Sequence, residues 1–170
     1  MNSKTVDQAR AELFADPYRG KECPCCNQHV QAYRRSLNGS MVLGLVLLAQ
    51  NPDAQTEFVH VEQYFASLEG NPAVKAAIRG DVTKLVYWGM LEKQAGKRAD
   101  GANANGHYRV TPYGMSFVLG QIAAPKYAYV YNGELLGLSD GTNNAAHEYV
   151  LVAECLRSGG FSYQELMRAA

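Results

Sequence analysis

Three of the four cysteines of this chain fall within four positions, in the run KECPCCNQH that begins at Lys21. Cys23 and Cys26 have the Cys-x-x-Cys spacing with which a tight turn directs two thiolates at one metal ion. His29 is close enough in sequence to extend this cluster, and Cys155 is a distant candidate. Because structural zinc takes four Cys or His ligands, the sequence predicts a structural zinc site formed by Cys23, Cys26, His29 and Cys155.

Two other interpretations of the Cys-rich run stay open. In the first, the cysteines are reduced thiols in an ordinary turn. In the second, they are a redox pair, and this interpretation is less favoured because no βαβ pattern surrounds them. A disulfide framework is disfavoured because we expect the chain in the reducing cytoplasm. That expectation follows from an N-terminus without a signal-peptide pattern and from the absence of a membrane-spanning apolar run.

A second set of candidate functional residues is cationic. The chain has 16 basic and 16 acidic residues and a net charge of zero, which by itself argues against a protein built to cover a polyanion. Residues 71–121, however, hold seven Lys or Arg against three acidic residues, a local balance of +4. A neutral total therefore hides a modestly basic stretch that is compatible with phosphate contacts.

Residues 72–88 are predicted to form an amphipathic helix. Its inner face comprises Val74, Ala77, Ile78, Val82, Leu85 and Trp88 on a wheel of about 100° per residue. Its outer face holds small residues, a hydroxyl, an aromatic ring and two cations, namely Ala76, Arg79, Gly80, Thr83, Lys84 and Tyr87. Such a face suits a helix in a major groove, and the alternative is an ordinary solvated surface.

A predicted β-ribbon follows this helix. One strand begins at Met90 and the other covers 107–110, and the Gly- and Asn-rich segment 95–106 between them is expected to be an irregular tip. In a winged helix such a tip reaches a phosphate backbone or a minor groove. The candidate nucleic-acid contacts outside the helix face are Lys75, Lys97, Arg98, Arg109, Arg34 and Arg35.

The elements that must position these residues come in an informative order. Predicted helices at 37–50 and 61–68 flank a short strand near 57–61, and the helix 72–88, the ribbon and a helix capped by Thr111 follow. This is the order of a winged helix.

Two further helices, 144–157 and 163–168, are predicted after a hairpin at 127–138 with Asn132-Gly133 as its type I′ turn. The tyrosines at 127, 129 and 131 share one strand face. They cover a core or a subunit contact, or alternatively stack on bases.

The predicted fold class is therefore α+β, with a winged helix-turn-helix core, an N-terminal Cys-rich knuckle and a C-terminal β-hairpin plus helices. The predicted domains are 1–36 for the N-terminal helix and knuckle, 37–122 for the winged helix, and 123–170 for the hairpin and helices, packed on the core.

Several short motifs carry a resemblance to a known group. These are CPCCNQ from Cys23, YRRSLN from Tyr33, KLVYWGML from Lys84, YRVTPYG from Tyr108 and YVYNGE from Tyr129. Over roughly residues 21–138 the chain resembles small, largely uncharacterised winged-helix proteins of phages and prokaryotes that carry an N-terminal CPxC zinc-knuckle-like motif. The resemblance implies DNA binding or a phage-host interaction, and it implies no enzymatic activity.

The sequence favours a non-enzymatic function. It contains no phosphate-cradling Gly motif, no Gly-x-Ser-x-Gly and no His-Glu-x-x-His, and its four histidines are scattered. We expect a cytoplasmic, double-stranded DNA-binding protein, a transcriptional regulator or accessory factor, without a membrane partner. The alternative is a protein-protein interaction module, for a phage or host factor or a homodimer, built on the same scaffold.

Overall fold

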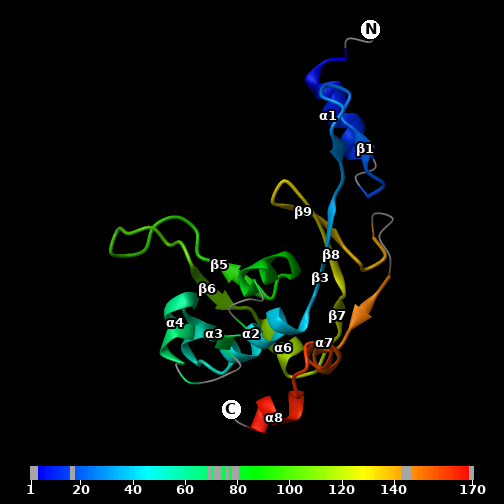
Figure 1. Ribbon diagram of the computed structural model, residues 1–170. Helices are drawn as coiled ribbons and strands as arrows, with labels where there is room; N and C mark the ends of the chain where they lie inside the picture. The colour runs from blue at the N-terminus through cyan, green and yellow to red at the C-terminus, as the bar shows by residue number, and fades with distance from the viewer. Residues whose placement is uncertain are drawn as a thin grey trace. The chain divides into compact units, whose positions relative to one another are not determined.

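The computed structural model describes residues 4–15, 18–68, 70, 74, 75, 77, 81–142 and 147–168. Within these ranges the chain is a mixed α+β protein whose strand pairs are antiparallel (Figure 1), which confirms the predicted class. The chain divides into two compact units, unit 1 (Met1–Ser36 with Tyr127–Glu148) and unit 2 (Leu37–Lys126 with Tyr149–Ala170). One boundary between the units lies after Ser36, and residues 123–170 are divided between both units.

In its described residues, unit 1 is built from two small antiparallel sheets and one helix. Its described elements are α1 (Val6–Ala15), β1 (Lys21–Glu22), β2 (His29–Val30), β3 (Tyr33–Ser36), β8 (Tyr127–Tyr131) and β9 (Glu134–Leu138). β1 pairs with β2, and the second sheet has the order β3-β8-β9. Asn132 and Gly133 join β8 to β9 with φ of 50° and 81°. Two positive φ values are the signature of a type I′ turn, so this prediction is confirmed.

The tyrosines of β8 pack on the N-terminal part of unit 1. Ala128 and Val130 are buried on the other face of the strand. The Tyr131 ring lies 5.7 Å from that of Phe14 and the Tyr129 ring 4.8 Å from that of Tyr18, both edge to face. Aromatic pairs of this geometry add stabilisation beyond the area that they bury. The tyrosine face is therefore engaged in packing, the use that the sequence favoured.

Unit 2 holds the remaining described elements, most of them helical. They are α2 (Gly39–Ala49), α3 (Asp53–Thr56), β4 (Val59–His60), α4 (Val61–Ser67), the 3₁₀-helix η1 (Val82–Trp88), β5 (Leu91–Lys93), β6 (His107–Val110), α6 (Pro112–Val118), β7 (Ala124–Pro125), β10 (Tyr149–Val150), α7 (Val152–Ser158) and α8 (Tyr163–Arg168). No helix in the described ranges combines the length and apolarity needed to cross a membrane.

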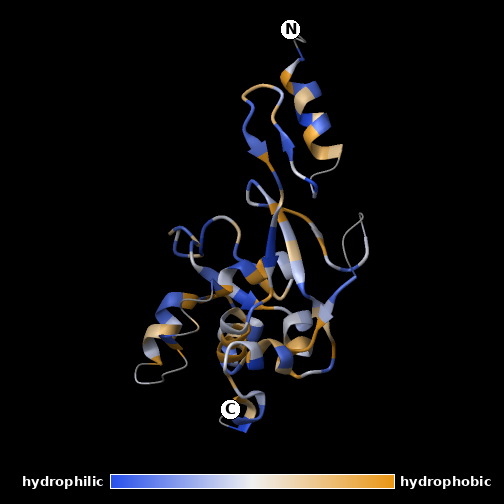
Figure 2. Cartoon of the chain, turned by 45° about the vertical axis from the view of Figure 1, so that its right-hand side comes forward, coloured by the Kyte–Doolittle hydropathy of each residue, from blue (hydrophilic) through white to orange (hydrophobic). Residues whose placement is uncertain are grey.

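The core of unit 2 forms around α2, which is hydrophobic along almost its whole length (Figure 2). The Asn38 side chain begins this helix by accepting a hydrogen bond from the Met41 N–H at 3.0 Å. α2 contacts α3, α6, α7, β6 and η1. At Gly44 a Cβ atom would lie 2.9 Å from Val82 Cγ2, so a glycine is required for η1 to approach this closely.

The three-stranded sheet of unit 2 has the order β4-β6-β5. β6 is the central strand and pairs with both neighbours. Tyr108, for example, is the register partner of Val59 in β4 and of Lys93 in β5. The connection between β5 and β6 extends away from the sheet (Figure 1). After β6, the Thr111 hydroxyl accepts a hydrogen bond from the Gly114 N–H at 3.1 Å and begins α6, as predicted from the Thr-Pro pair.

The single helix predicted for residues 72–88 is wrong. Val74, Lys75 and Ala77 are helical, but Asp81 has a left-handed backbone with φ 54° and ψ 43°, which an α-helix does not accommodate. A 3₁₀-helix follows, in which Val82, Leu85 and Trp88 are buried. That three-residue spacing matches the period of a 3₁₀-helix, and it also fits an α-helical wheel, which explains the error.

The C-terminal helices differ from their predicted bounds. The helix predicted for residues 144–157 begins at Val152, after strand β10, and residues 144–146 of that prediction lie outside the described part. The predicted cap of the last helix is confirmed, because the Ser162 hydroxyl accepts from the Glu165 N–H at 3.4 Å and α8 begins at Tyr163.

Candidate functional site

The first group of predicted nucleic-acid contacts lies on η1. A 3₁₀-helix has three residues per turn, so Lys84 and Tyr87 share one row along it. Thr83, Lys84 and Tyr87 are half-buried, in contrast to the fully buried Val82 and Leu85. The structure therefore keeps these three candidates on the side of η1 that is not in the core.

Two further candidates precede η1 in the sequence. Lys75 is helical and exposed. Arg79 lies outside the described residues, as do Ala76 and Gly80 of the predicted outer face. The left-handed residue Asp81 separates Lys75 from η1, so one continuous helix does not present all the predicted contacts.

The tip between β5 and β6 is more ordered than expected. Lys97 and Asn103 form an isolated antiparallel bridge. The Arg98 N–H donates to the Ala102 carbonyl at 2.8 Å inside the bridge, and the Ala104 N–H donates to the Gly96 carbonyl at 3.3 Å just outside it. The tip contains no helix or strand in the described residues, as predicted, but turns and this single bridge order it, and its glycines supply the positive φ values that these turns require. Lys97 is exposed on the tip.

Arg98 forms an ion pair with Asp100 within the tip. Asp100 also accepts a hydrogen bond from the Ala102 N–H at 3.0 Å. These two donors, the Ala102 amide first and Arg98 second, hold the pKa of Asp100 below its ordinary value. The Asp100 carboxylate thus offsets the charge of one of the two cations predicted to hold a phosphate backbone.

Arg109 is also paired. Its Nη2 donates to Glu92 Oε2 at 2.6 Å, and its guanidinium carbon lies 4.8 Å from the centre of the Phe58 ring. The sequence analysis missed Glu92 and Phe58 as partners because their proximity depends on the strand register. Lys93, the next residue of β5, is exposed and joins the candidate phosphate contacts.

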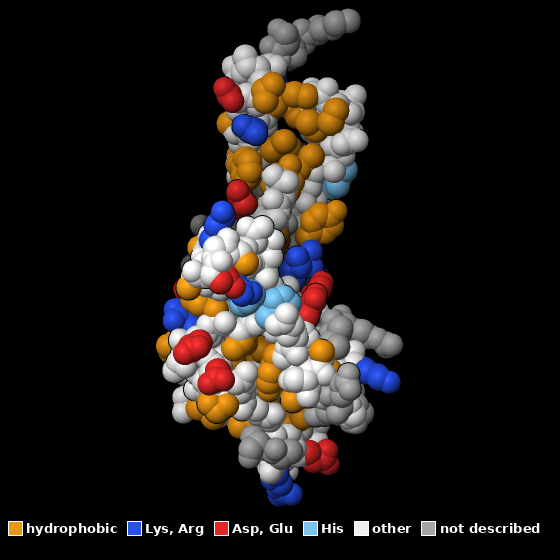
Figure 3. Space-filling model, turned by 90° about the vertical axis from the view of Figure 1, so that its left-hand side faces the viewer, with side chains coloured by type: hydrophobic (Ala, Val, Ile, Leu, Met, Phe, Trp, Pro, Cys, Tyr) orange, Lys and Arg blue, Asp and Glu red, His pale blue; other side chains and the backbone are white. Residues whose placement is uncertain are grey.

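The described cations of unit 2 are thus mixed with carboxylates. Figure 3 shows Lys, Arg, Asp and Glu side chains interspersed on the face that it presents, without a continuous basic surface there. An open polar hollow lies beside the tip, lined by Thr56, Glu57, Phe58, Gln94, Arg98, Ala99, Asp100, His107 and Arg109. Both paired arginines line this hollow.

His60 and His107 form the base of the ribbon. They are register partners between β4 and β6, with ring centres 4.9 Å apart in an edge-to-face arrangement. His60 Nδ1 accepts a hydrogen bond from the Gln63 N–H at 3.4 Å at the start of α4. Both imidazoles therefore have structural contacts, which the spacing of the histidines in the sequence did not indicate.

Arg34 and Arg35 lie on β3, in unit 1, and are exposed. The guanidinium carbon of Arg34 is 4.6 Å from the centre of the Tyr127 ring, a cation-π contact. These two arginines therefore belong to a different unit from the other predicted contacts.

The Cys-rich run forms the turn between β1 and β2. The Cys23 N–H donates to the Gln28 carbonyl and the Asn27 N–H donates to the Cys23 carbonyl, both at 2.8 Å. Asn27 has a left-handed φ of 57°. The backbone N–H groups of Cys25 and Cys26 donate to the Cys23 sulfur, and these hydrogen bonds lower the pKa of Cys23. Three of the predicted ligands, Cys23, Cys26 and His29, belong to this hairpin.

Cys155, the fourth predicted ligand, has a different environment. It belongs to unit 2 and is only 2% exposed. Its thiol donates to the Leu37 carbonyl at 3.5 Å, and burial raises its pKa to about 12. In the part of the chain that the structure describes, no three Cys, His, Asp or Glu side chains converge as a metal-binding group.

Comparison of the chain with protein-family models, with curated proteins and with solved structures finds no match.

Proposed function

We propose that unit 2 is a winged-helix domain and that the protein binds double-stranded DNA as a transcriptional regulator or accessory factor. The observation that carries this proposal is the β4-β6-β5 sheet order, with α2 before β4, α4 and η1 between β4 and β5, and an extended ribbon between β5 and β6. Two helices, a third helical segment and a three-stranded sheet with an extended ribbon support the proposal, because a winged-helix DNA-binding domain combines these parts.

The side chains available for DNA support backbone contacts more than base contacts. Exposed lysines occur on the helical segment before η1, on β5 and on the tip, at Lys75, Lys93 and Lys97. Lys84 and Tyr87 lie in one row of η1, where a cation and an aromatic ring can meet a phosphate and a sugar or base edge. The wing arginines contribute less charge because Glu92 and Asp100 offset them.

A small number of phosphate contacts predicts a moderate dependence on salt. For four contacts, at Lys75, Lys84, Lys93 and Lys97, the slope of log Kobs against log salt concentration is expected to be about −4. The experiment is fluorescence anisotropy with the full chain and labelled genomic fragments at about 50 mM and about 200 mM salt. If no fragment binds at the lower salt concentration, the proposal is rejected.

Two matched variants make this experiment specific to the proposed surface. Lys84→Ala should weaken binding and reduce the salt slope by about 1, as the loss of one phosphate contact requires. Arg168→Ala also removes one exposed cation from unit 2, on α8, and should leave binding unchanged. Equal effects of both variants would mean that binding depends only on overall charge.

The second candidate function is a protein interaction module. One observation favours it: unit 2 exposes Tyr113, Tyr149 and Leu151, which are 37%, 46% and 45% exposed. Exposed aromatic and aliphatic side chains are typical of protein interfaces. Loss of a stoichiometric partner on Leu151→Ser, with no effect of Lys84→Ala, would favour this function over DNA binding.

A further inference from the structure

Asparagine is among the chemically labile residues of proteins, and Asn-Gly pairs are where it reacts most readily. The Gly nitrogen attacks the carbonyl carbon of the Asn side chain to close a succinimide ring. Glycine favours this step because it has no Cβ to obstruct the approach. The chain contains three such pairs, Asn38-Gly39, Asn105-Gly106 and Asn132-Gly133. All three lie within the described residues, so their environments can be compared.

The Asn38-Gly39 pair is held on both sides of the reacting bond. The Asn38 Oδ1 accepts a hydrogen bond from the Met41 N–H at 3.0 Å, and the Asn38 carbonyl accepts one from the Val42 N–H at 3.1 Å. Gly39 is buried at the start of α2, where a Cβ would lie 2.6 Å from the Cys155 carbonyl oxygen. Ring closure at Asn38 would therefore have to break the cap of a core helix.

The Asn132-Gly133 pair is held by the hairpin that it closes. Tyr131 and Glu134, the residues on either side of it, are register partners of β8 and β9. Asn132 has a left-handed φ of 50°, and a type I′ turn fixes the backbone of both of its central residues. Attack by the Gly133 nitrogen therefore requires the paired end of the hairpin to open.

The Asn105-Gly106 pair lies in an exposed turn of the tip. The His107 N–H donates to the Ala104 carbonyl at 3.3 Å and closes this turn. Gly106 has a φ of 77°, as the third residue of a type II turn does. Asn105 itself is exposed. A long hydrogen bond thus closes the turn around this pair, in contrast to the helix cap at Asn38 and the paired strands at Asn132.

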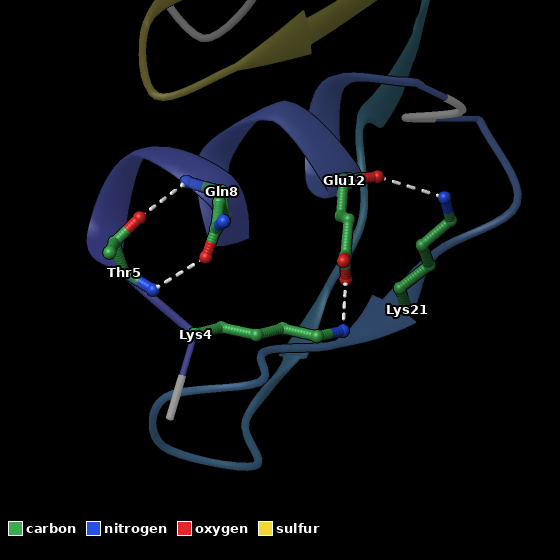
Figure 4. A network of polar contacts seen from close by, with 5 residues as sticks. All are labelled: Lys4, Thr5, Gln8, Glu12 and Lys21. Carbon is green, nitrogen blue, oxygen red and sulfur yellow. Dashed lines mark hydrogen bonds and ion pairs between the residues drawn. The ribbon is translucent and has the colours of Figure 1, made fainter. Parts of the chain in front are cut away.

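The reacting groups of Asn105 and Gly106 are not engaged elsewhere. In the described part of the chain, no hydrogen bond involves the Asn105 side-chain amide or the Gly106 N–H. Gln8 on α1 shows the contrasting case, because its side-chain oxygen accepts from the Thr5 N–H at 3.0 Å (Figure 4). The Asn105 side chain is therefore free to turn towards the Gly106 nitrogen.

A hydrogen-bond donor also lies where negative charge develops in this reaction. His107 Nδ1 is 3.1 Å from the Asn105 carbonyl oxygen, and since a carbonyl oxygen has no hydrogen, Nδ1 is the donor. When the Gly106 nitrogen loses its proton and attacks, the charge of the amide spreads to this oxygen, and a donor placed there stabilises it. The His60 ring packs edge to face against that of His107 at 4.9 Å between centres and restrains its orientation.

We propose that Asn105 is the Asn-Gly site at which this protein deamidates and that His107 promotes the reaction. The Gly106 nitrogen gives its proton to water or hydroxide and bonds to Asn105 Cγ. The Cγ–Nδ2 bond breaks, and the leaving nitrogen takes up a proton and departs as ammonia. Water then opens the succinimide at either carbonyl, which gives aspartate or isoaspartate. Each product adds one negative charge to the tip, and this inference does not depend on DNA binding.

The experiment follows deamidation of the full chain during incubation at mildly alkaline pH. Peptide mapping by mass spectrometry compares the three pairs in one sample, and Asn105 is expected to react several-fold faster than Asn38 and Asn132. In concentrated urea, which removes these environments, the three rates should converge. Isoelectric focusing should show a more acidic species, because the unmodified chain has a net charge of zero. Asn105→Gln should abolish that species, whereas Asn103→Gln, a matched change in the same tip, should keep it.

A further variant tests the donor. His107→Phe keeps an aromatic ring beside His60 but removes Nδ1, so it should slow the reaction at Asn105 and leave Asn132 unchanged. Circular dichroism verifies that the variant is folded. A faster reaction at Asn38 or Asn132 than at Asn105 in the folded protein, or rates that urea does not change, would overturn the assignment of the site. An undiminished rate at Asn105 in folded His107→Phe would overturn the role of His107.

Discussion

Arg109 and Glu92 face each other across β5 and β6, and both Nε and Nη2 of the arginine donate to the same carboxylate oxygen, at 3.2 and 2.6 Å. The arginine side chain is 36% exposed and the glutamate side chain 48%. An ion pair in such a position contributes little to stability because solvent screens it. Its main consequence is that the arginine is less available to a phosphate than the sequence suggested.

A double-mutant cycle with Arg109→Gln and Glu92→Gln should measure this pairing. The coupling free energy in urea unfolding is expected to be about 0.2–1 kcal/mol, and it should decrease in about 1 M salt. Glu92→Gln releases the arginine and is expected to tighten DNA binding, and Arg109→Gln should weaken it less than Lys84→Ala does. A larger loss of affinity with Arg109→Gln than with Lys84→Ala would contradict the assignment of Arg109 as a paired residue.

Gly44→Ala should destabilise unit 2. A helical glycine replaced by alanine normally gains stability, by about 0.5–1 kcal/mol, so the sign of the effect is diagnostic. The new methyl group would lie 2.9 Å from Val82 Cγ2, and overpacking of this kind costs about 1–3 kcal/mol. The double variant Gly44→Ala/Val82→Ala should lose less unfolding free energy than the sum of the losses in the two single variants. Additive effects in urea unfolding would argue against the contact.

Ser139→Ala should reduce the stability of unit 1. The Ser139 hydroxyl is fully buried, accepts from the Tyr127 N–H at 2.9 Å and donates to the Glu148 carbonyl at 2.8 Å. Without this hydroxyl, the Tyr127 N–H and the Glu148 carbonyl each lose one hydrogen bond, which is expected to lower the free energy of unfolding by about 1–3 kcal/mol. Hydrogen exchange at the Tyr127 amide reports the change locally, and Ser36→Ala on the exposed β3 is a control expected to have no effect. Unchanged exchange at Tyr127 would refute the role of this hydroxyl.

The four cysteines should react with iodoacetamide at different rates. Burial raises the pKa of Cys155 to about 12, so at pH 8 its thiol is both protonated and inaccessible. Cys23 is partly exposed and its pKa is lowered, so it should be alkylated first in metal-free protein. Peptide mapping by mass spectrometry should find Cys155 modified only after denaturation. Native modification of Cys155 at the rate of Cys25 would show that this part of unit 2 opens readily.

Arg98→Ala should raise the pKa of Asp100 only partly towards its ordinary value. The larger cause of the lowered pKa is the Ala102 amide and the second is Arg98, so the amide contribution remains in the variant. A carboxyl with a lowered folded-state pKa stabilises the fold above its unfolded pKa, and this contribution is lost as the pH falls through the folded pKa. NMR titration of the carboxyl carbon gives both values, and complete recovery in Arg98→Ala would make the arginine the sole cause.

Local signals in the sequence predicted much of the fold. The uninterrupted apolar run of α2, the Thr111-Pro112 start of α6 and the Asn132-Gly133 turn each depend on neighbouring residues only. The break at Asp81 could not be predicted this way, because the spacing of Val82, Leu85 and Trp88 satisfies α-helical and 3₁₀ periods alike. There the approach of Val82 to Gly44, a contact distant in sequence, accompanies the 3₁₀ form.

The candidate site was predicted less completely than the fold. The sequence identifies cations by type, but whether each is available depends on its neighbours in space. Glu92 is 17 residues from Arg109 and becomes its partner only through the strand register. The turn at Cys23 was recognisable because its geometry is local, whereas the burial of Cys155 depends on helix packing in unit 2. Tertiary contacts thus decided which predicted residues remain candidates.

The chain passes between units 1 and 2 three times, after Ser36, after Lys126 and after Glu148. Unit 2 therefore cannot be excised as one continuous fragment free of unit 1. A truncation that starts at Leu37 would keep β8 and β9 but remove β3, whose residues Tyr33 to Ser36 pair with Val130 to Tyr127. The exposed edge of β8 would then be available to another chain. Shortened versions intended to isolate DNA binding are expected to self-associate by strand addition, which would give an artefactual dimer that the full chain does not form.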